Sequence, residues 1–201
     1  MPRKSDKRER LVDSAKNLMF KQGFNLTTLA DIAQEADVPL GNVYYYFKTK
    51  ESIGEAVIVY CVAELNQRLA SYNTFNTPHE RLNAFIDDEA KEMEWTLKFG
   101  DKFGSLCQEL AKQGGPLADE CSALMSNTIN WLQKQFTECG LSNNDAADKA
   151  KLFTAKLQGV NLMAVTFKNA DKVHDLLNFL RSELNADLAS AKSYAGETEH
   201  A

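Results

Sequence analysis

Proline and glycine are scarce in this chain: its 201 residues include only 4 prolines and 10 glycines. Sheets joined by tight turns and disordered linkers both draw heavily on these two residue types. The apolar–polar alternation that marks a half-buried strand is absent as well. These absences exclude a disordered or sheet-rich protein and predict an all-α fold.

Long apolar runs are also missing. No run approaches the roughly 18 residues that a transmembrane helix needs, and no signal-peptide core follows the N-terminus. The sequence therefore predicts a cytoplasmic protein with no membrane partner. The cysteines show no C-x-x-C spacing, so free thiols are expected rather than disulfides or metal ligands. They are Cys61, Cys107, Cys121 and Cys139.

Catalytic motifs are lacking in the same way. The chain has neither a glycine-rich phosphate-binding loop nor an H-E-x-x-H zinc motif. Its three histidines, His79, His174 and His200, have no cysteine or serine partner at the spacing of a catalytic motif. Carboxylates are plentiful, but charged helix faces explain them. We therefore predict that the protein is not an enzyme and uses no cofactor and no metal.

Charge is unevenly distributed along the chain. The net charge is −5, which by itself argues against a nucleic-acid partner. Residues 1–50, however, hold 9 Lys and Arg against 6 Asp and Glu, whereas the remaining 151 residues hold 14 against 22. A basic N-terminal segment on an acidic remainder fits DNA binding by that segment alone.

Residues 27–50 have the pattern of two short helices joined by a tight turn. Thr28 is a natural N-cap, and Asp31 follows it at the spacing of a capping box. The first helix should end shortly before Val38, because a residue that precedes proline is pushed out of the helical region. Pro39 itself suits the first position of the second helix.

The second of these helices has an unusual outer face. Gly41 leaves the helix start without a side chain, so the backbone can approach another surface closely. Tyrosine hydroxyls, an asparagine amide and lysines suit phosphate and base-edge contacts in a DNA major groove. The outward residues are Leu40, Gly41, Asn42, Tyr44, Tyr45, Tyr46, Lys48 and Lys50. The alternative is an amphipathic helical pair with an exposed aromatic run.

This stretch resembles the helix-turn-helix of the TetR family of bacterial transcriptional repressors. The matching residues are Thr27-Thr28, Asp31-Ile32-Ala33, Ala36, Val38, Gly41, Val43-Tyr44, Phe47, Lys48, Lys50 and Glu51. The resemblance implies a three-helix head that binds double-stranded DNA through Thr27 and Thr28 together with the outward residues. Pro39 and Leu40 depart from the family pattern of a serine N-cap followed by lysine or arginine, which leaves the operator sequence unpredictable.

Apolar residues at helical spacing continue along the chain. Gly23 should end a first helix, and Phe24 and Leu26 should fill the core of the head. Later helices are predicted over about 50–72, 78–97, 106–113, 116–138, 142–168 and from 171 onward. We assign residues 1–50 to a helix-turn-helix DNA-binding domain and 51–201 to a helical ligand-binding and dimerisation domain.

The last two predicted helices carry apolar stripes. In the TetR family such a pair forms a four-helix interface, so the resemblance implies a homodimer; a monomer that buries both stripes against its own body is the alternative. A two-fold dimer would place two recognition helices on a palindromic site. We therefore expect a repressor that binds a palindromic operator as a dimer and is released by a small molecule.

The middle helices carry aromatic, methionine and amide residues that suit a small apolar or aromatic inducer. They are Phe85, Met93, Trp95, Phe99, Phe103, Cys107, Trp131, Gln158, Asn161 and Met163. An ordinary core contains the same residue types at the same spacing. The inducer pocket therefore follows mainly from the family resemblance.

The segment from Gly100 to Glu109 resembles a subgroup of the family that includes the repressor of N-ethylmaleimide reductase. That subgroup often has a cysteine where this chain has Asp101, so its electrophile-sensing cysteine is not carried over. A redox- or electrophile-sensing repressor acting through Cys107 or Cys121 is the alternative function, and it requires an exposed thiol with a lowered pKa. The other interpretation of Cys107 is a buried structural residue. A purely structural helical adaptor is a further alternative, which the surface from Gly41 to Lys50 argues against.

Overall fold

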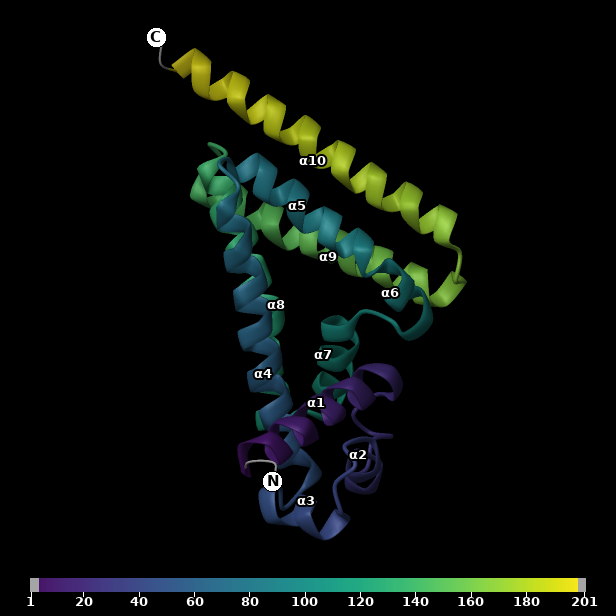
Figure 1. Cartoon of the computed structure of the whole chain (residues 1–201). Coiled ribbons are helices and arrows are strands. Elements are labelled where there is room, and N and C mark those ends of the chain that lie inside the picture. The colour runs from purple at the N-terminus through teal and green to yellow at the C-terminus, as the bar shows by residue number, and fades with distance from the viewer. Residues whose placement is uncertain (1–3, 199–201) are drawn as a thin grey trace. The chain divides into compact units, whose positions relative to one another are not determined.

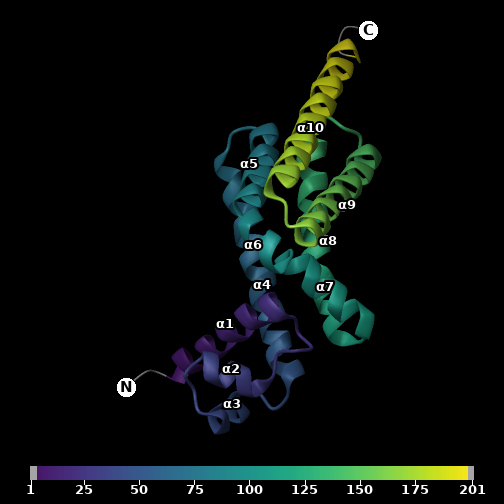
Figure 2. The same ribbon diagram turned by 90° about the vertical axis from the view of Figure 1, so that its right-hand side faces the viewer.

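The computed structural model describes residues 4–198, and every regular element among them is helical (Figure 1 and Figure 2). The elements are α1 (Lys4–Gln22), α2 (Leu29–Glu35), α3 (Leu40–Tyr46), α4 (Lys50–Ser71), the 3-10 turn η1 (Tyr72–Thr74), α5 (Pro78–Lys91), α6 (Met93–Phe99), α7 (Lys102–Gln113), α8 (Pro116–Glu138), α9 (Asn143–Phe167) and α10 (Ala170–Thr198). The predicted all-α fold is confirmed. In the range 4–198, no helix is long and apolar enough to cross a membrane.

The helices pack into two compact units. The head unit consists of the chain up to Leu65 together with residues 102–125, and the body unit consists of residues 66–101 and the chain from Ser126 onward. The boundaries fall inside α4 and α8, so each of these helices contributes to both units. Residues 1–3 of the predicted DNA-binding domain lie outside the described residues. The division of roles between residues 1–50 and 51–201 stays a prediction.

The core of the head unit lies where α1, α2 and α3 meet. Leu11 of α1, Ile32 of α2 and Val43 of α3 are fully buried there. Each such burial contributes about 1.5–3 kcal/mol, whereas helices as short as α2 and α3 are not stable alone. Phe24, after α1, packs against α4 at Gly54, where an added Cβ would lie 2.8 Å from the ring.

Aromatic rings form the core of the body unit. The ring centroid of Phe85, on α5, lies 5.6 Å from that of Trp131 on α8 and 6.4 Å from that of Phe153 on α9. The ring of Tyr72 lies 5.4 Å from Trp131. Helix α10 packs against α5, α6 and α9, so four helices share this unit with the body ends of α4 and α8 (Figure 2).

Half-buried charges adjoin this core. The Tyr72 hydroxyl donates to the Asp88 carboxylate at 2.8 Å, and the Arg68 guanidinium donates to Glu89 at 3.3 Å. Glu89 exposes only 14% of its side chain. Burial raises the pKa of Glu89 to about 7, while the nearby Arg68 charge opposes that rise and the Asp101 charge adds to it.

We expect the stability of the body unit to depend on pH through Glu89. The folded-state pKa of Glu89 is raised from 4.5 to about 7. The free energy of unfolding is therefore highest below the unfolded-state pKa, where Glu89 is protonated in both states, and it falls as pH rises through the folded-state pKa. The loss amounts to at most about 3 kcal/mol, at roughly 1.4 kcal/mol per pKa unit. Denaturant unfolding at several pH values between these two pKa values measures the loss. Glu89→Gln should flatten the dependence, whereas Glu94→Gln, at an exposed position of α6, should not.

Four local details differ from the sequence predictions. The helix predicted over 106–113 begins four residues earlier, because α7 starts at Lys102. The predicted helix over 78–97 is two helices, because the backbone at Glu92 has a ψ of −3°, outside the helical range. Pro39 is the N-cap of α3, one position earlier than predicted, with a ψ of 136°. Leu26 does not fill the core: 73% of its surface is exposed, whereas Phe24 is buried.

Candidate nucleic-acid interface

Helix α2 begins and ends as its own sequence dictates. The Asp31 N–H donates to Thr28 Oγ1 at 3.1 Å, and the Thr28 N–H donates to Asp31 Oδ2 at 2.9 Å, which completes the predicted capping box. Hydrogen bonds from the Thr28 hydroxyl and N–H lower the pKa of Asp31. At the other end, Asp37 has a φ of +50°, and the Val38 N–H donates to the Ala33 carbonyl at 2.9 Å. The chain therefore turns sharply towards α3.

Arg10, on α1, holds this turn. Its guanidinium donates to the carbonyls of Ala36 and Asp37, the latter at 3.2 Å. Carbonyls at the end of a helix lack intrahelical partners, and a cation there also complements the helix dipole. The path of the chain between α2 and α3 is therefore fixed by α1.

Helix α3 has an open outer face. Tyr44 and Tyr45 expose 48% and 62% of their surfaces, and Leu40 exposes 40%. An added Cβ at Gly41 would meet no atom within 4 Å. Lys48 is exposed just after the helix. The face combines phenol groups, an ammonium group and uncovered backbone, all of which suit phosphate and base-edge contacts.

Other residues predicted to bind DNA make contacts inside the head unit. Thr27 is fully buried, and its hydroxyl donates to the Gly23 carbonyl at 2.7 Å, so its side chain holds the turn rather than facing solvent. The Thr28 hydroxyl donates to the Asp31 carboxylate within the capping box. Asn42 and Tyr46 are half-buried beside the open face. DNA contact by these four residues stays a prediction.

Two opposite charges hold the turn between α1 and α2, an arrangement that we call the turn clamp. Both carboxylate oxygens of Glu109, on α7, accept hydrogen bonds of 2.8 Å from the N–H groups of Phe24 and Asn25. The Lys50 ammonium donates to the carbonyls of the same two residues at 3.2 and 3.1 Å. Gly23 permits this approach, because its φ is +88° and an added Cβ would lie 2.8 Å from the Glu109 carboxylate.

Glu109→Ala is expected to lower the free energy of unfolding of the head unit by about 1–3 kcal/mol, because two backbone N–H groups lose their acceptor. Denaturant unfolding of the full chain measures the change. Glu120→Ala, at an exposed position of α8, is the control and should change stability by less than about 0.5 kcal/mol. If the two variants unfold alike, water replaces the Glu109 carboxylate without cost and the clamp has no energetic role.

The residues predicted to line an inducer pocket are spread over both units. Those buried in the body unit are Phe85, Met93 and Asn161. Those half-buried in the body unit are Trp95, Phe99, Trp131 and Gln158. Met163 is 41% exposed on α9, and Phe103 and Cys107 belong to the head unit. A site built from all of them stays a prediction.

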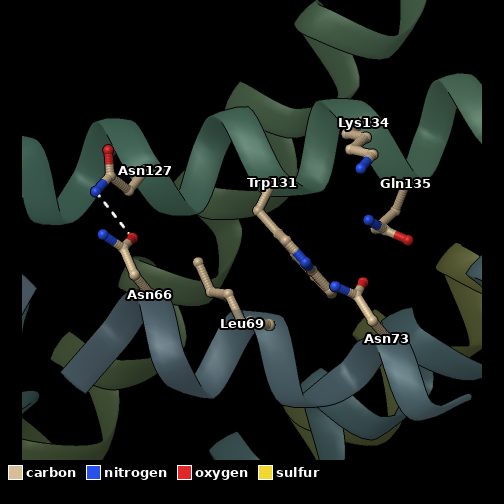
Figure 3. Close-up of a pocket in the computed structure, with 8 residues that line it drawn as sticks. Asn66, Leu69, Asn73, Asn127, Trp131, Lys134 and Gln135 are labelled. Carbon is tan, nitrogen blue, oxygen red and sulfur yellow. Dashed lines mark hydrogen bonds between the residues drawn. The ribbon is translucent and has the colours of Figure 1, made fainter. Parts of the chain in front are cut away.

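A cavity of about 400 Å³ lies in the body unit between α4, η1 and α8 (Figure 3). Its lining is largely amide and cationic, with the Trp131 ring in the middle; the residues are Asn66, Leu69, Ala70, Asn73, Asn127, Trp131, Lys134 and Gln135. Asn127 Nδ2 donates to Asn66 Oδ1 at 3.0 Å across it. Within residues 4–198, the buried Trp131 Nε1 has no hydrogen-bond partner. Of the predicted pocket residues, Trp131 is the one that lines this cavity.

Comparison with known proteins agrees with this geometry. The family described as bacterial regulatory proteins, tetR family, matches residues 11–57, which span α1 to the start of α4. The biofilm operon icaADBC HTH-type negative transcriptional regulator IcaR of Staphylococcus aureus (strain Newman) is 34% identical over 188 residues, covering 85% of this chain and 97% of its own length. The HTH-type transcriptional repressor NemR of Escherichia coli (strain K12) is 23% identical, with 88% and 93% covered.

A solved structure shows the same fold over almost the whole chain. A TetR transcriptional regulator from Legionella pneumophila superposes with a TM-score of 0.78 at 19% sequence identity, covering 91% of this chain and 98% of its own. All three proteins are transcriptional regulators and not enzymes, as the sequence predicted. With a relative 34% identical along most of both sequences, this chain belongs to the tetR family of bacterial transcriptional regulators.

Proposed function

We propose that the protein is a repressor that binds a palindromic operator as a homodimer and releases it when a small molecule binds. The open face of α3 carries the proposal, because it presents exposed phenol groups and uncovered backbone on a helix-turn-helix held rigid from α1 and α7. The relative from Staphylococcus is named a negative regulator and the one from Escherichia a repressor. Both names favour repression over activation.

Exposed apolar side chains on α9 and α10 support the homodimer. Soluble proteins rarely leave such a group uncovered, and the members on these two helices are Leu152, Leu162, Met163, Phe167 and Phe179. A two-fold dimer through this surface buries these side chains in both copies. The same symmetry places one head on each half of a palindrome.

The cavity around Trp131 supports release by a small ligand. Its amides and Lys134 offer hydrogen-bond donors beside one aromatic ring. We propose a ligand with a flat ring that packs on Trp131 and with acceptor or anionic groups that meet the amides and the ammonium. This proposal modifies the apolar or aromatic inducer expected from the sequence, because most of the cavity lining is polar.

The test is binding of the purified full chain to DNA fragments upstream of its own gene, repeated across a salt series. We expect specific binding. The logarithm of its association constant should fall linearly with the logarithm of the salt concentration, with a slope of about −0.9 for each phosphate neutralised. Tyr44→Ala should weaken that binding at least about tenfold through loss of a base-edge or phosphate contact at each half-site. Tyr60→Ala, equally exposed but on α4, is the matched control.

Two outcomes would count against the proposal. If no genomic fragment is preferred over random DNA, the α3 face does not read DNA sequence. If Tyr44→Ala and Tyr60→Ala bind the operator alike, the contacts are made by another surface of the head unit.

A thiol-sensing repressor is the second candidate. One observation favours it: the Sγ atoms of Cys107 and Cys121 lie 3.2 Å apart. The two candidates share the same DNA-binding face and differ only in the signal that releases the operator.

A further inference from the structure

Two cysteines of the head unit are in contact. The Sγ of Cys107, on α7, lies 3.2 Å from the Sγ of Cys121, on α8. The Cys107 thiol also donates to the Cys121 carbonyl at 3.3 Å. Neither cysteine forms a disulfide, so both are in the reduced form. Because a disulfide has an S–S distance of about 2.05 Å, the two sulfurs need to close by roughly 1.2 Å.

The two thiols differ in access to solvent. Cys107 is half-buried, whereas Cys121 is fully buried. The hydrogen bond with Cys107, and then burial, raise the pKa of the Cys121 thiol, so Cys121 keeps its proton. Cys107 is therefore the residue of the pair nearer to solvent, and Cys121 is the one in contact with it from inside the unit. This is the arrangement of a reacting and a resolving thiol.

A third thiol is close to the pair but less suited to react. Cys61, on α4, is fully buried, and burial raises its pKa to about 12. Cys139 lies in the body unit, beyond the end of α8. Both serve as internal comparisons for the pair.

We propose that Cys107 and Cys121 form a dithiol site that a hydroperoxide oxidises to a disulfide, and that this oxidation weakens operator binding. The Cys107 thiol gives up its proton and its sulfur attacks the terminal peroxide oxygen. The O–O bond breaks, the attacked hydroxyl group stays on sulfur, and the departing alkoxide, or hydroxide from hydrogen peroxide, takes up the Cys107 proton to become an alcohol or water. Cys107 becomes a sulfenic acid. The Cys121 sulfur then attacks the Cys107 sulfur, the S–O bond breaks, and the hydroxyl group leaves with the Cys121 proton as water. The two thiols lose two electrons in total, and the peroxide takes them up.

The disulfide acts on the DNA-binding face through α7. Cys107 and Glu109 are two residues apart on this helix, and Glu109 holds the N–H groups of Phe24 and Asn25 at 2.8 Å. A displacement of α7 by roughly 1 Å lengthens both hydrogen bonds beyond their effective range of about 3.2 Å. The turn before α2 is then no longer clamped. This step rests on the proposed function, whereas the chemistry of the two thiols does not.

The first experiment identifies the bond. The reduced full chain is treated with hydrogen peroxide, its remaining thiols are alkylated, and it is cut with trypsin without reduction. Trypsin places Cys61, Cys107, Cys121 and Cys139 in separate fragments, namely residues 51–68, 103–112, 113–134 and 135–149. We expect fragment 103–112 linked to 113–134, loss of two of the four thiols, and full reversal by a reductant. A link to 51–68 or 135–149, or a sulfinic acid on Cys107 without any link, would overturn the dithiol site.

The second experiment measures operator binding before and after the same oxidation. Wild type and Cys139→Ser should lose at least about tenfold in affinity, because two charge-assisted hydrogen bonds are lost. Cys107→Ser should keep its affinity, as should Cys121→Ala, a replacement that suits the buried position. An equal loss in wild type and Cys107→Ser would refute the link between the pair and the head. Reduced protein that binds no DNA would instead refute the proposed function, and the linked fragments would still decide the dithiol site.

Discussion

Gly41→Ala is expected to leave the free protein folded and to lower operator affinity by roughly 100-fold. In the free protein an added Cβ at Gly41 meets no atom within 4 Å. Alanine also favours helix over glycine by about 0.5–1 kcal/mol, so stability should stay the same or rise slightly. In the complex, however, the methyl group comes between α3 and the groove. Such overpacking costs about 1–3 kcal/mol at each half-site, and a dimer meets it twice.

Gly54→Ala provides the contrast for this prediction. At Gly54 an added Cβ would lie 2.8 Å from the Phe24 ring and 3.2 Å from Leu117, so the clash occurs within the head unit itself. This variant should lose thermal stability, whereas Gly41→Ala should lose only DNA binding. Thermal unfolding and fluorescence anisotropy on an operator fragment separate the two effects. Wild-type affinity in Gly41→Ala would mean that the start of α3 does not approach DNA closely.

The helix boundaries were predictable because their signals are local. A capping box joins residues three positions apart, as in Thr28 with Asp31, which formed as the sequence indicated. The structure has a second one at the start of α5, between Thr77 and Glu80. Gly23 likewise ends α1 with a positive φ. The outward face of α3 follows from helical period, because Val43 and Phe47, four residues apart, are both buried. Nothing outside the segment was needed for any of these predictions.

The contacts that hold the interface were not predictable, because their partners are distant in sequence. Glu109 lies 85 residues after Phe24, and no local pattern marks it as the acceptor for that N–H. DNA contact by Lys50 stays a prediction, and no local pattern shows that its ammonium donates to the carbonyls of Phe24 and Asn25. The same limit applies to the Cys107 and Cys121 pair. Spacing of 14 residues across a loop gives no sign that the two sulfurs meet.

The position of the cavity was not predictable from the sequence for a different reason. Aromatic residues at helical spacing predict burial, but burial does not distinguish a packed core from the wall of a cavity. Phe85 and Met93 are buried in the body unit. The cavity instead opens among Asn66, Asn73 and Asn127, whose amides gave no signal in the sequence.

Phe167→Lys is expected to convert the dimer to monomers and to lower operator affinity by at least about 1,000-fold. Phe167 exposes 64% of its surface at the end of α9. Burial of a side chain of this size contributes about 1.5–3 kcal/mol, and a two-fold interface loses it in both copies. A monomer then holds one half-site with no second head attached, which removes an avidity gain of about 100- to 10,000-fold. A lysine at a helix C-terminus complements the helix dipole, so the helix itself should not be weakened.

Phe75→Lys is the matched control for that result, because Phe75 is a phenylalanine of the same unit, 42% exposed, at the end of η1 and not on α9 or α10. Sedimentation distinguishes a 22.5 kDa monomer from a particle of twice that mass. We expect Phe75→Lys to sediment and bind the operator as wild type does. If Phe167→Lys remains dimeric, the copies meet through another surface. If it is monomeric and still binds at full affinity, one head suffices and the operator need not be palindromic. Loss of both dimer and affinity, with unchanged helical content, would tie the apolar face of α9 and α10 directly to DNA binding.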